Sequence, residues 1–427
     1  MLTSILTNFS ARFMGAVLNF LMLLLTTHWL GAGIRGEISI LQLSINLIHL
    51  ISDIGGGPAM VYLVPRAIRS KLLLTGGLWA AFASFGVGSM LVSYELLPPE
   101  FSTEVLIVGF LFSLHSVNQN ILLGQGRIKE YNILIMMQGV VMFGTMAGSI
   151  LLAETRTAEA FLHACYVAYG LTWLTGLLMV LRKPHAPTIQ ETRPLLFVLF
   201  ANGFFTQLAT LTHQLSIREN FFHLKKYYGG ETVAVGIYST AISLGEAILL
   251  FSASVAAVLM SKVSNTLATE ENRIKTLQLA KLSVGITVPG IVLFLIVPAV
   301  FYSWLLGKDF APVKEVFASV VPGIVLISFG TVFAHYFSGA GKHYVNFIAG
   351  IIGLVMALVS APLLIQSNQT IGAGWSASLA YGSLALFVFG VFIFSGKHPV
   401  KDLKTLLPRR DDFTQLKTFL NRKKDHN

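Results

Sequence analysis

The sequence predicts an all-α integral membrane protein with twelve transmembrane helices, arranged as two parallel six-helix halves around a central cavity. Three observations lead to this prediction: a composition that is 54% hydrophobic and only 12% charged, twelve long apolar stretches, and short motifs that recur in both halves of the chain. Soluble domains carry roughly 25% charged residues, so this composition is typical of a chain that folds in lipid.

Each of the twelve apolar stretches is long enough to cross about 30 Å of hydrocarbon as a helix. A polar segment, "RKPHAPTIQETRP", separates the sixth stretch from the seventh, and a charged tail follows the twelfth. We expect an N-terminal six-helix bundle at 1–181, a cytoplasmic linker at 182–194, a C-terminal six-helix bundle at 195–395 and a basic cytoplasmic tail at 396–427. The expected helices are 12–30, 37–63, 72–94, 104–124, 132–153, 158–181, 195–217, 232–260, 282–303, 315–338, 343–365 and 372–395.

The basic residues predict the orientation of these helices, because short translocated loops avoid positive charge. With a cytoplasmic N-terminus, 23 of the 30 Lys and Arg residues lie on the inner side and 7 on the outer side. We therefore expect both termini to face the cytoplasm. The net charge of +10 follows from this bias and from the basic tail, so it does not require a nucleic-acid partner.

The start of the chain is expected to remain as the first helix. Arg12 lies late for the charged region of a signal peptide, and no small-x-small cleavage site precedes Gly31. The single cysteine, Cys165, lies in an apolar stretch and offers neither a disulfide framework nor a cysteine metal site.

Short motifs recur at equivalent places in the two sets of helices. "GEIS" (36–39) recurs as "GIYS" (236–239), "GQGR" (124–127) as "GAGK" (339–342), and "AYG" (168–170) as "AYG" (380–382). Six helices per half give both halves the same orientation, which predicts an axis along the membrane normal and suits alternating access. We interpret the two G-x-G motifs as tight turns after a helix end, since a lone G-x-G is weak support for a phosphate site.

Polar residues follow one face of the second helix. A carboxylate at the bilayer centre costs about 2.5 to 3.5 kcal/mol, so this face must meet protein or water. Pro58 and the three glycines before it predict a bend near mid-membrane. Asp53 has two open roles, as a structural acceptor or as a group for ion coupling or gating. The spacing of 3, 4, 3 and 4 residues places on one face Ser39, Gln42, Asn46, His49 and Asp53.

The first, seventh and eighth helices carry similar polar faces, which predicts a hydrophilic cavity between the halves. Glu246 lies ten residues into the eighth helix, about 15 Å deep, so it cannot reach the interface and needs a partner, a proton or water. Arg12 and Arg218 lie near helix ends and have the alternative of reaching the interface. The polar residues expected to contact substrate from these faces are Asn46, His49, Gln207 and His213.

Four segments carry a resemblance to a known family: "LGAGIRGEISI", "SDIGGGPAMVYLVPR", "VGIYSTAISL" and "LLGKDFAPVKEV". With the twelve helices, they resemble the Wzx-type polysaccharide flippases, in the superfamily that also contains multidrug and toxin extruders and lipid II flippases. The resemblance covers residues 1–395. It implies movement of an isoprenoid pyrophosphate-linked oligosaccharide, such as an O-antigen unit, from the inner to the outer leaflet of the bacterial cytoplasmic (inner) membrane.

The resemblance also implies roles for particular residues. Arg12, Arg35 and Arg218 would meet the pyrophosphate and the sugars, and Asp53 and Glu246 would couple transport to an ion or act as counter-ions of these arginines. The implied partners are the lipid-linked oligosaccharide, membrane lipids, H⁺ or Na⁺ as coupling ion, and the polysaccharide polymerase and glycosyltransferases of the same pathway. No cofactor or metal is expected.

Two other functions remain open. A cation-coupled multidrug extruder shares the predicted fold and also uses intramembrane acids. A membrane glycan polymerase or ligase would need a sizeable outer loop with catalytic groups, whereas the longest outer connection here is about 218–231. The chain has no Walker A, H-E-x-x-H or G-x-S-x-G motif, so we expect a transporter and not an enzyme.

Overall fold

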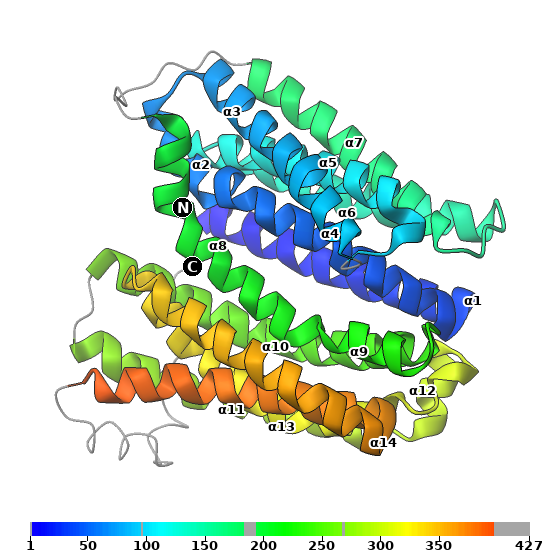
Figure 1. Cartoon of the computed structure of the whole chain (residues 1–427). Coiled ribbons are helices and arrows are strands. Elements are labelled where there is room, and N and C mark those ends of the chain that lie inside the picture. Colours follow the sequence, from blue (N-terminus) through cyan, green and yellow to red (C-terminus); the bar gives the residue numbers. More distant parts are fainter. Residues whose placement is uncertain (1, 95–96, 183–193, 267–269, 397–427) are drawn as a thin grey trace. The chain divides into compact units, whose positions relative to one another are not determined.

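The computed structural model describes residues 2–94, 97–182, 194–266 and 270–396, and every regular element in these ranges is helical (Figure 1). This confirms the predicted all-α fold. The elements are α1 (Leu2–Gly56), α2 (Pro58–Leu63), η1 (Val64–Arg66), α3 (Arg69–Ala81), η2 (Phe82–Val87), α4 (Gly88–Ser93), η3 (Pro99–Phe101), α5 (Ser102–Gly124), α6 (Ile128–Leu151), α7 (Glu159–Arg182), α8 (Leu195–Arg218), α9 (Asn220–Tyr227), α10 (Val233–Thr266), α11 (Glu270–Ile296), α12 (Ala299–Leu306), η4 (Lys308–Phe310), α13 (Val313–Gly339) and α14 (His343–Phe394).

Nine candidate membrane spans are long and apolar enough to cross a bilayer, counted over the described ranges. Two of them, α1 and α14, contain non-helical backbone, at Gly31 in α1 and at Asn368 and Gln369 in α14, so each covers two predicted spans. The helix α8 occupies the place of the predicted seventh span. The chain is therefore a multi-pass membrane protein whose helices correspond to the predicted stretches.

The predicted ninth span differs from the structure at both ends. We expected it at 282–303, but α11 begins at Glu270 and ends at Ile296, and a new helix starts at Ala299. Two glutamates occupy the first turn of α11, where negative charge stabilises a helix. The polar residues before the apolar stretch are therefore helical too, although hydrophobicity alone does not predict this. Pro298 precedes α12 and has no amide hydrogen to continue α11.

The predicted breaks and turns are confirmed. The second predicted helix is interrupted at Gly57, where α1 gives way to α2, which starts with Pro58. Gly126 and Gly341 have φ of 71° and 73°, a region that favours glycine, and both follow the end of a long helix. The residue after each glycine makes the same hydrogen bond to the preceding helix. The Arg127 amide donates to the Leu122 carbonyl at 2.9 Å, and the Lys342 amide donates to the Phe337 carbonyl at 2.8 Å. The same turn therefore follows the fourth and the tenth spans.

The chain divides into two compact units that are not contiguous in sequence. Unit 1 comprises Met1–Leu211, Leu224–Thr240 and Val300–Pro312, and unit 2 comprises Thr212–His223, Ala241–Ala299 and Val313–Asn427. The predicted domain limits stay a prediction, and most of the predicted linker and nearly all of the predicted tail, at 183–193 and 397–427, lie outside the described residues.

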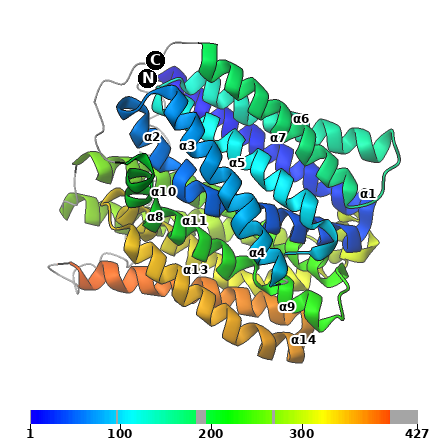
Figure 2. The same cartoon turned by 45° about the horizontal axis from the view of Figure 1, so that its top comes forward.

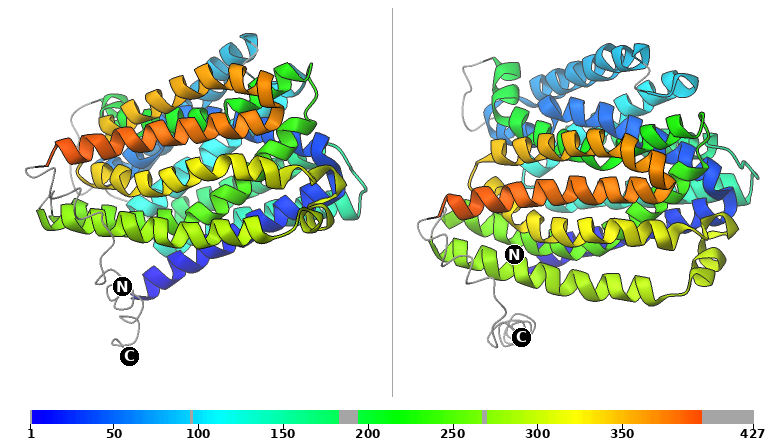
Figure 3. Two further views of the ribbon diagram at one scale, coloured as in Figure 1. Left: turned by 90° about the horizontal axis from the view of Figure 1, so that it is seen from below. Right: turned by 60° about the horizontal axis from the view of Figure 1, so that its bottom comes forward.

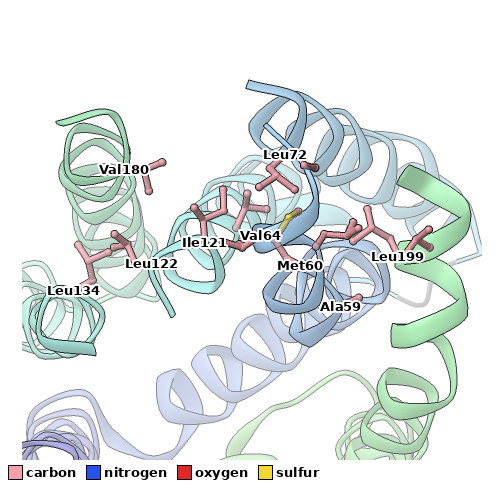
Figure 4. Close-up of a cluster of buried hydrophobic side chains, with 13 residues drawn as sticks. Ala59, Met60, Val64, Leu72, Ile121, Leu122, Leu134, Val180 and Leu199 are labelled. Carbon is pink, nitrogen blue, oxygen red and sulfur yellow. The ribbon is translucent and has the colours of Figure 1, made fainter. Parts of the chain in front are cut away.

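Unit 1 is a bundle in which α5, α6 and α7 run alongside one another, and α5 and α6 pack on α1 (Figure 2). One end of this bundle has a dense apolar core, where side chains from α2, α5 and α8 meet around Met60, Ile121 and Leu199 (Figure 4). Because lipid is as apolar as these side chains, this core is stabilised by close van der Waals packing more than by transfer from water.

At another part of unit 1, three of the quoted motifs meet at the break in α1. The carboxylate of Asp309, in η4, accepts a hydrogen bond from the amide of Ala32 at 3.3 Å, and so caps the helix that restarts after Gly31. A methyl group added to Gly236 would lie 1.9 Å from the Ala32 carbonyl oxygen, and Thr232 donates to the carbonyl of Gly33 at 2.9 Å. Residues 31–36 are therefore contacted both by η4 and by the N-terminal end of α10.

In unit 2, α13 packs along α14 (Figure 3). Small residues allow this approach: Gly323 lies against Ser378, and Gly330 against Ala385. The two limbs of α14 lie side by side, since the hydroxyls of Ser360 and Ser376 are 2.9 Å apart. Edge-on and tilted ring contacts complete the packing and involve Phe329, Phe333, Tyr336, Phe337, Phe389 and Phe392.

Candidate functional site

Asp53 lies near the end of α1 in unit 1, among polar groups from two helices. Its Oδ1 accepts a hydrogen bond from the Ser116 hydroxyl of α5 at 3.0 Å, and its Oδ2 lies 3.7 Å from Nε2 of His49, one turn earlier on α1. Asn120 donates to the Gly56 carbonyl at 3.2 Å and to the Ser116 carbonyl at 3.0 Å. We call His49, Asp53, Ser116 and Asn120 the Asp53 cluster. His49 and Asp53 keep 14% and 16% of their side chains exposed, so the cluster is reachable from outside the protein interior.

The glycines after Asp53 allow close packing around this cluster. A methyl group added to Gly57 would lie 2.8 Å from both the Asp53 carbonyl oxygen and Nε2 of Gln207, and one added to Gly55 would overlap the Trp79 ring. Gln207, which is buried, therefore contacts the broken end of α1. The run of three glycines brings α8 and α3 against the backbone that carries Asp53.

The polar residues of α5 divide between two roles. His115 and Asn118 are buried, and Asn118 donates to the Trp173 carbonyl at 3.0 Å. They pack against neighbouring helices. Ser116 and Asn120, which contact the Asp53 cluster, were missed. A signal was present, because Phe112, Ser116 and Asn120 are four residues apart and share one face of α5.

His49 is held between its carboxylate neighbour and an aromatic stack. Its ring lies parallel to that of Phe112 at 3.7 Å between centroids, and Phe112 stacks in turn on Tyr169 at 4.4 Å. Tyr169 belongs to the first "AYG" motif and is buried. The stack restricts the imidazole while its Nε2 lies 3.7 Å from the Asp53 carboxylate.

In unit 2, Arg218 at the end of α8 forms an ion pair with Glu246 of α10. Arg218 Nη2 lies 3.0 Å from Glu246 Oε1, and the side chains are 17% and 41% exposed, respectively. Glu246 was predicted to need a partner, a proton or water, and the structure gives it Arg218 as a partner. Nε of Arg218 is buried and has no hydrogen-bond partner in the described part of the chain.

Three further groups of unit 2 surround this pair. His213, one and a half turns before Arg218 on α8, interacts electrostatically with Glu246, Arg218 and His335 of α13. Tyr381, from the second "AYG" motif, interacts with Glu246 and Arg218. The helix α8 is fixed here because Gly350 of α14 leaves no space beside Thr212: an added methyl group would lie 2.2 Å from its hydroxyl oxygen. The base of the pair is thus rigid.

The remaining candidate residues are dispersed. Arg35 is buried in α1, and Asn46 is half-buried on the same helix. The side chain of Arg12 lies outside the described residues. In the predicted outer segment, the buried Glu219 pairs with His223 at 3.0 Å. No group of three or more His, Cys, Asp and Glu side chains that could hold a metal ion occurs among the described residues.

The two arrangements differ in chemistry. The Asp53 cluster offers a carboxylate with a neutral or protonated imidazole, which suits a proton or a small cation. The Arg218–Glu246 pair offers a guanidinium, which can bind a phosphate through two parallel hydrogen bonds once its own carboxylate withdraws. Asp53 in unit 1 and Glu246 in unit 2 therefore lie in different electrostatic settings.

No protein-family model and no curated protein matches the chain. Solved structures do match over nearly its whole length. An inward-facing multidrug resistance MATE family transporter of the MOP superfamily aligns with a TM-score of 0.68 and 16% identity, covering 89% of this chain and 94% of that chain. The lipid II flippase MurJ, in an inward closed conformation, aligns with a TM-score of 0.67 and 14% identity, covering 100% of this chain and 94% of the flippase.

A third match is a MOP superfamily transporter from Pyrococcus furiosus Vc1 (DSM3638), described as having a binding pocket of reversed polarity that suggests a different function. Its TM-score is 0.64 at 15% identity, and the alignment covers 92% of this chain and 95% of that chain. Identities this low show the fold alone. The chain has the fold of the MOP superfamily transporters, which includes both multidrug transporters and a lipid II flippase.

Proposed function

We propose that this chain is a flippase that moves an isoprenoid pyrophosphate-linked oligosaccharide from the inner to the outer leaflet by alternating access, for surface polysaccharide biosynthesis. The observation that carries the proposal is the guanidinium of Arg218, held in unit 2 beside Glu246 at 3.0 Å. A pyrophosphate diester is an anion that must cross the bilayer, and arginine recognises phosphate through paired, charge-assisted hydrogen bonds. The shared fold with a lipid II flippase supports the same class of substrate.

The other residues take roles consistent with this substrate. Arg12 and Arg35 of unit 1, and separately Arg218 of unit 2, would meet phosphate or sugar. Neutral hydrogen-bonding groups for the glycan would come from Asn46, His49, Gln207 and His213. Asp53, bonded to Ser116 and beside His49, would couple transport to H⁺ or Na⁺. The lipid tail would stay in the bilayer, so the protein needs to enclose only the polar head.

A multidrug extruder is the second candidate, and one observation favours it. In the Asp53 cluster a carboxylate lies beside stacked rings, with 3.7 Å between the His49 and Phe112 centroids, and acids with aromatic rings are suited to organic cations. An extruder of cations has no use for an arginine at its binding groups, because like charges repel. The arginine in unit 2 therefore favours the anionic lipid substrate.

The test is made in cells that lack the gene. The leaflet of the lipid-linked oligosaccharide pool is measured with a glycan-modifying enzyme that cannot cross the membrane, and dye efflux is followed in parallel. Glycan that accumulates on the inner leaflet and is released by the intact protein would support the flippase. Normal glycan sidedness with lost dye efflux would identify a multidrug extruder, and accumulation on the outer leaflet would identify a polymerase or ligase.

Variants of Arg218 sharpen this test. Arg218→Met should lower flipping by about tenfold or more, and Arg218→Lys should be intermediate, because lysine keeps the charge but not the two-pronged hydrogen bonding. The matched control is Lys226→Met, which removes a positive charge from an exposed position of α9. Wild-type flipping by Arg218→Met would contradict the role of Arg218 in binding the pyrophosphate, on which the proposal rests.

The proposed substrate also implies where the protein lies in the cell and which enzymes work with it. We place the chain in a bacterial inner membrane with both termini in the cytoplasm, where glycosyltransferases build the substrate, and with the polymerase receiving it outside. Single cysteines at exposed Lys129 and Gly230, in a Cys165→Ser background, should react with an impermeant thiol reagent from the inner and the outer side, respectively. The reverse pattern would overturn the orientation.

A further inference from the structure

Arg218 is not available to a ligand in this structure. Its Nη2 donates to Glu246 Oε1 at 3.0 Å, and its side chain is only 17% exposed. Buried Nε has no hydrogen-bond partner among the described residues, so the guanidinium still has an unused donor. Any anion that binds Arg218 through two parallel hydrogen bonds must first take the place of the Glu246 carboxylate.

The two members of the pair differ in freedom. Glu246 has 41% of its side chain exposed, whereas Arg218 extends from α8, which packs tightly against α14 at Thr212 and Ser216. The carboxylate can therefore turn away toward the open side while the guanidinium stays in place. Glu246 is the member that moves.

Displacing the carboxylate creates a charge problem at once. The released carboxylate stays attached to α10 and can still come close to the phosphate on Arg218. Two unit charges 4 Å apart interact by about 4 kcal/mol at an effective dielectric constant of 20, so an ionised Glu246 at that distance would be repelled. A proton on the carboxylate removes this repulsion. Arg218 of α8 pairs with Glu246 directly, and His213 of α8 and Tyr381 of α14 interact with it electrostatically. His335 of α13 interacts in the same way with His213.

We infer that the Arg218–Glu246 pair is a proton-linked anion site: a phosphate group replaces the Glu246 carboxylate on Arg218, and the released carboxylate binds one proton. This inference rests on the proposed function and adds to it a reason for pH-dependent substrate binding. One proton leaves a solvent or buffer acid and forms the carboxyl O–H bond of Glu246, and no bond between heavy atoms forms or breaks. Release of the phosphate restores the ion pair and returns the proton.

The uptake of a proton on anion binding determines how the affinity for the anion changes with pH. If one proton is taken up for each anion bound, the affinity rises as the pH falls, by up to about tenfold per pH unit. In Glu246→Gln the competing charge is absent, so the anion should bind more tightly at about pH 8 and with little further gain at about pH 6. Glutamine keeps the size of the side chain and can still accept from Arg218.

The experiment uses the purified full chain in detergent and isothermal titration calorimetry. The first probe is a short isoprenyl pyrophosphate carrying one sugar, because its phosphates are diesters that stay ionised in this pH range. Titrations in two buffers of different ionisation enthalpy give the number of protons taken up. We expect about one proton for the wild type, none for Glu246→Gln, and loss of binding for Arg218→Met.

One variant is a control for this measurement, and a second, at a residue that the proposed function places at the glycan, tests the other group that could take up the proton. Glu315→Gln removes an exposed carboxylate of α13 in the same unit and should keep wild-type affinity and proton uptake. His213→Gln tests the imidazole that also faces the pair: the inference requires that it retain the proton uptake, and loss of uptake in this variant would overturn Glu246 as the acceptor. A melting curve of each variant shows that it is folded.

The outcomes separate this inference from the proposed function. Binding by the wild type with the same proton uptake in Glu246→Gln would overturn the inference and leave the flippase proposal standing. No binding of the diester by the wild type at either pH would overturn both. Inorganic pyrophosphate is the second probe, and the same Glu246-dependent uptake with it would support the site and identify free phosphate as an additional ligand.

Discussion

The hydroxyls of Ser39 and Ser239 form a hydrogen bond, with 2.8 Å between their oxygens, although they are 200 residues apart in the chain. They are the last residues of the two recurring motifs "GEIS" and "GIYS". Their first residues, Gly36 and Gly236, lie against the backbone carbonyls of Thr232 and Ala32, respectively. Equivalent segments of the two halves therefore pack directly on each other in unit 1, in a reciprocal arrangement.

This reciprocal contact should not tolerate added volume. A methyl group on Gly236 would lie 1.9 Å from the Ala32 carbonyl oxygen, so Gly236→Ala should destabilise the protein by about 1 to 3 kcal/mol, as overpacking does. The measurement is thermal unfolding in detergent. Gly144→Ala is the matched control, because nothing lies within 4 Å of its added methyl group in α6, and there alanine should be neutral or stabilising. Equal melting temperatures for the two variants would contradict the contact.

The cap on the restarted half of α1 should also contribute to stability. Asp309→Ala removes the acceptor of the Ala32 amide, which should cost about 0.5 to 2 kcal/mol. Glu315→Ala, an exposed acid in the first turn of α13, controls for the loss of a carboxylate. Hydrogen exchange at residues 32–36 locates the effect, and unchanged protection there in Asp309→Ala would show that the cap is unimportant.

Two arginines cap the C-terminal ends of long helices: Arg69 caps α7, and Arg273 caps α14. Arg69 in α3 donates to the Leu181 carbonyl at 3.1 Å, and Arg273 in α11 donates to the Phe392 carbonyl at 2.8 Å and stacks on its ring at 4.1 Å. Arg273→Met should destabilise unit 2 by about 1.5 to 3 kcal/mol, because a charged donor to buried carbonyls is lost.

The control for Arg273 lies two residues further along the same helix. Lys275 pairs with Glu271 at an exposed position, and such surface pairs contribute about 0 to 1 kcal/mol. Lys275→Met should therefore melt near the wild type in the same detergent. A melting temperature for Arg273→Met as high as that of Lys275→Met would mean that the helix end needs no cap.

The Asp53 cluster predicts a coupling defect that can be separated from a folding defect. Asp53→Asn keeps an acceptor for the Ser116 hydroxyl but removes the charge, so substrate flipping in vesicles should lose its response to an imposed ion gradient. Ser116→Ala removes one hydrogen bond, at a cost of about 1 kcal/mol, and should keep that response. A gradient response in Asp53→Asn equal to that of the wild type would leave Asp53 as a structural acceptor.

Residues of the candidate site show what could be foreseen. Glu246 could be predicted to have a partner because its depth forbids reaching the interface, and the break at Gly57 followed from proline and glycine chemistry. The identity of the partner, Arg218, could not, because it depends on how α8 and α10 are rotated toward each other. The roles of Ser116 and Asn120 were missed for the same reason, because the neighbour of a polar residue on an apolar helix depends on how that helix is rotated against the others.

The sequence by itself determined the all-α fold, the approximate limits of the membrane-crossing segments, and the turns at Gly126 and Gly341. These features depend on local chemistry: the thickness of the hydrocarbon sets the length of each apolar run, and glycine alone enters positive φ freely. Only the tertiary structure decided that Asp309 caps α1, that Ser39 meets Ser239, and that Arg218 meets Glu246. Such contacts join residues tens to hundreds of positions apart, and in lipid they are selected by close packing and hydrogen bonding between helix faces, which no single segment specifies.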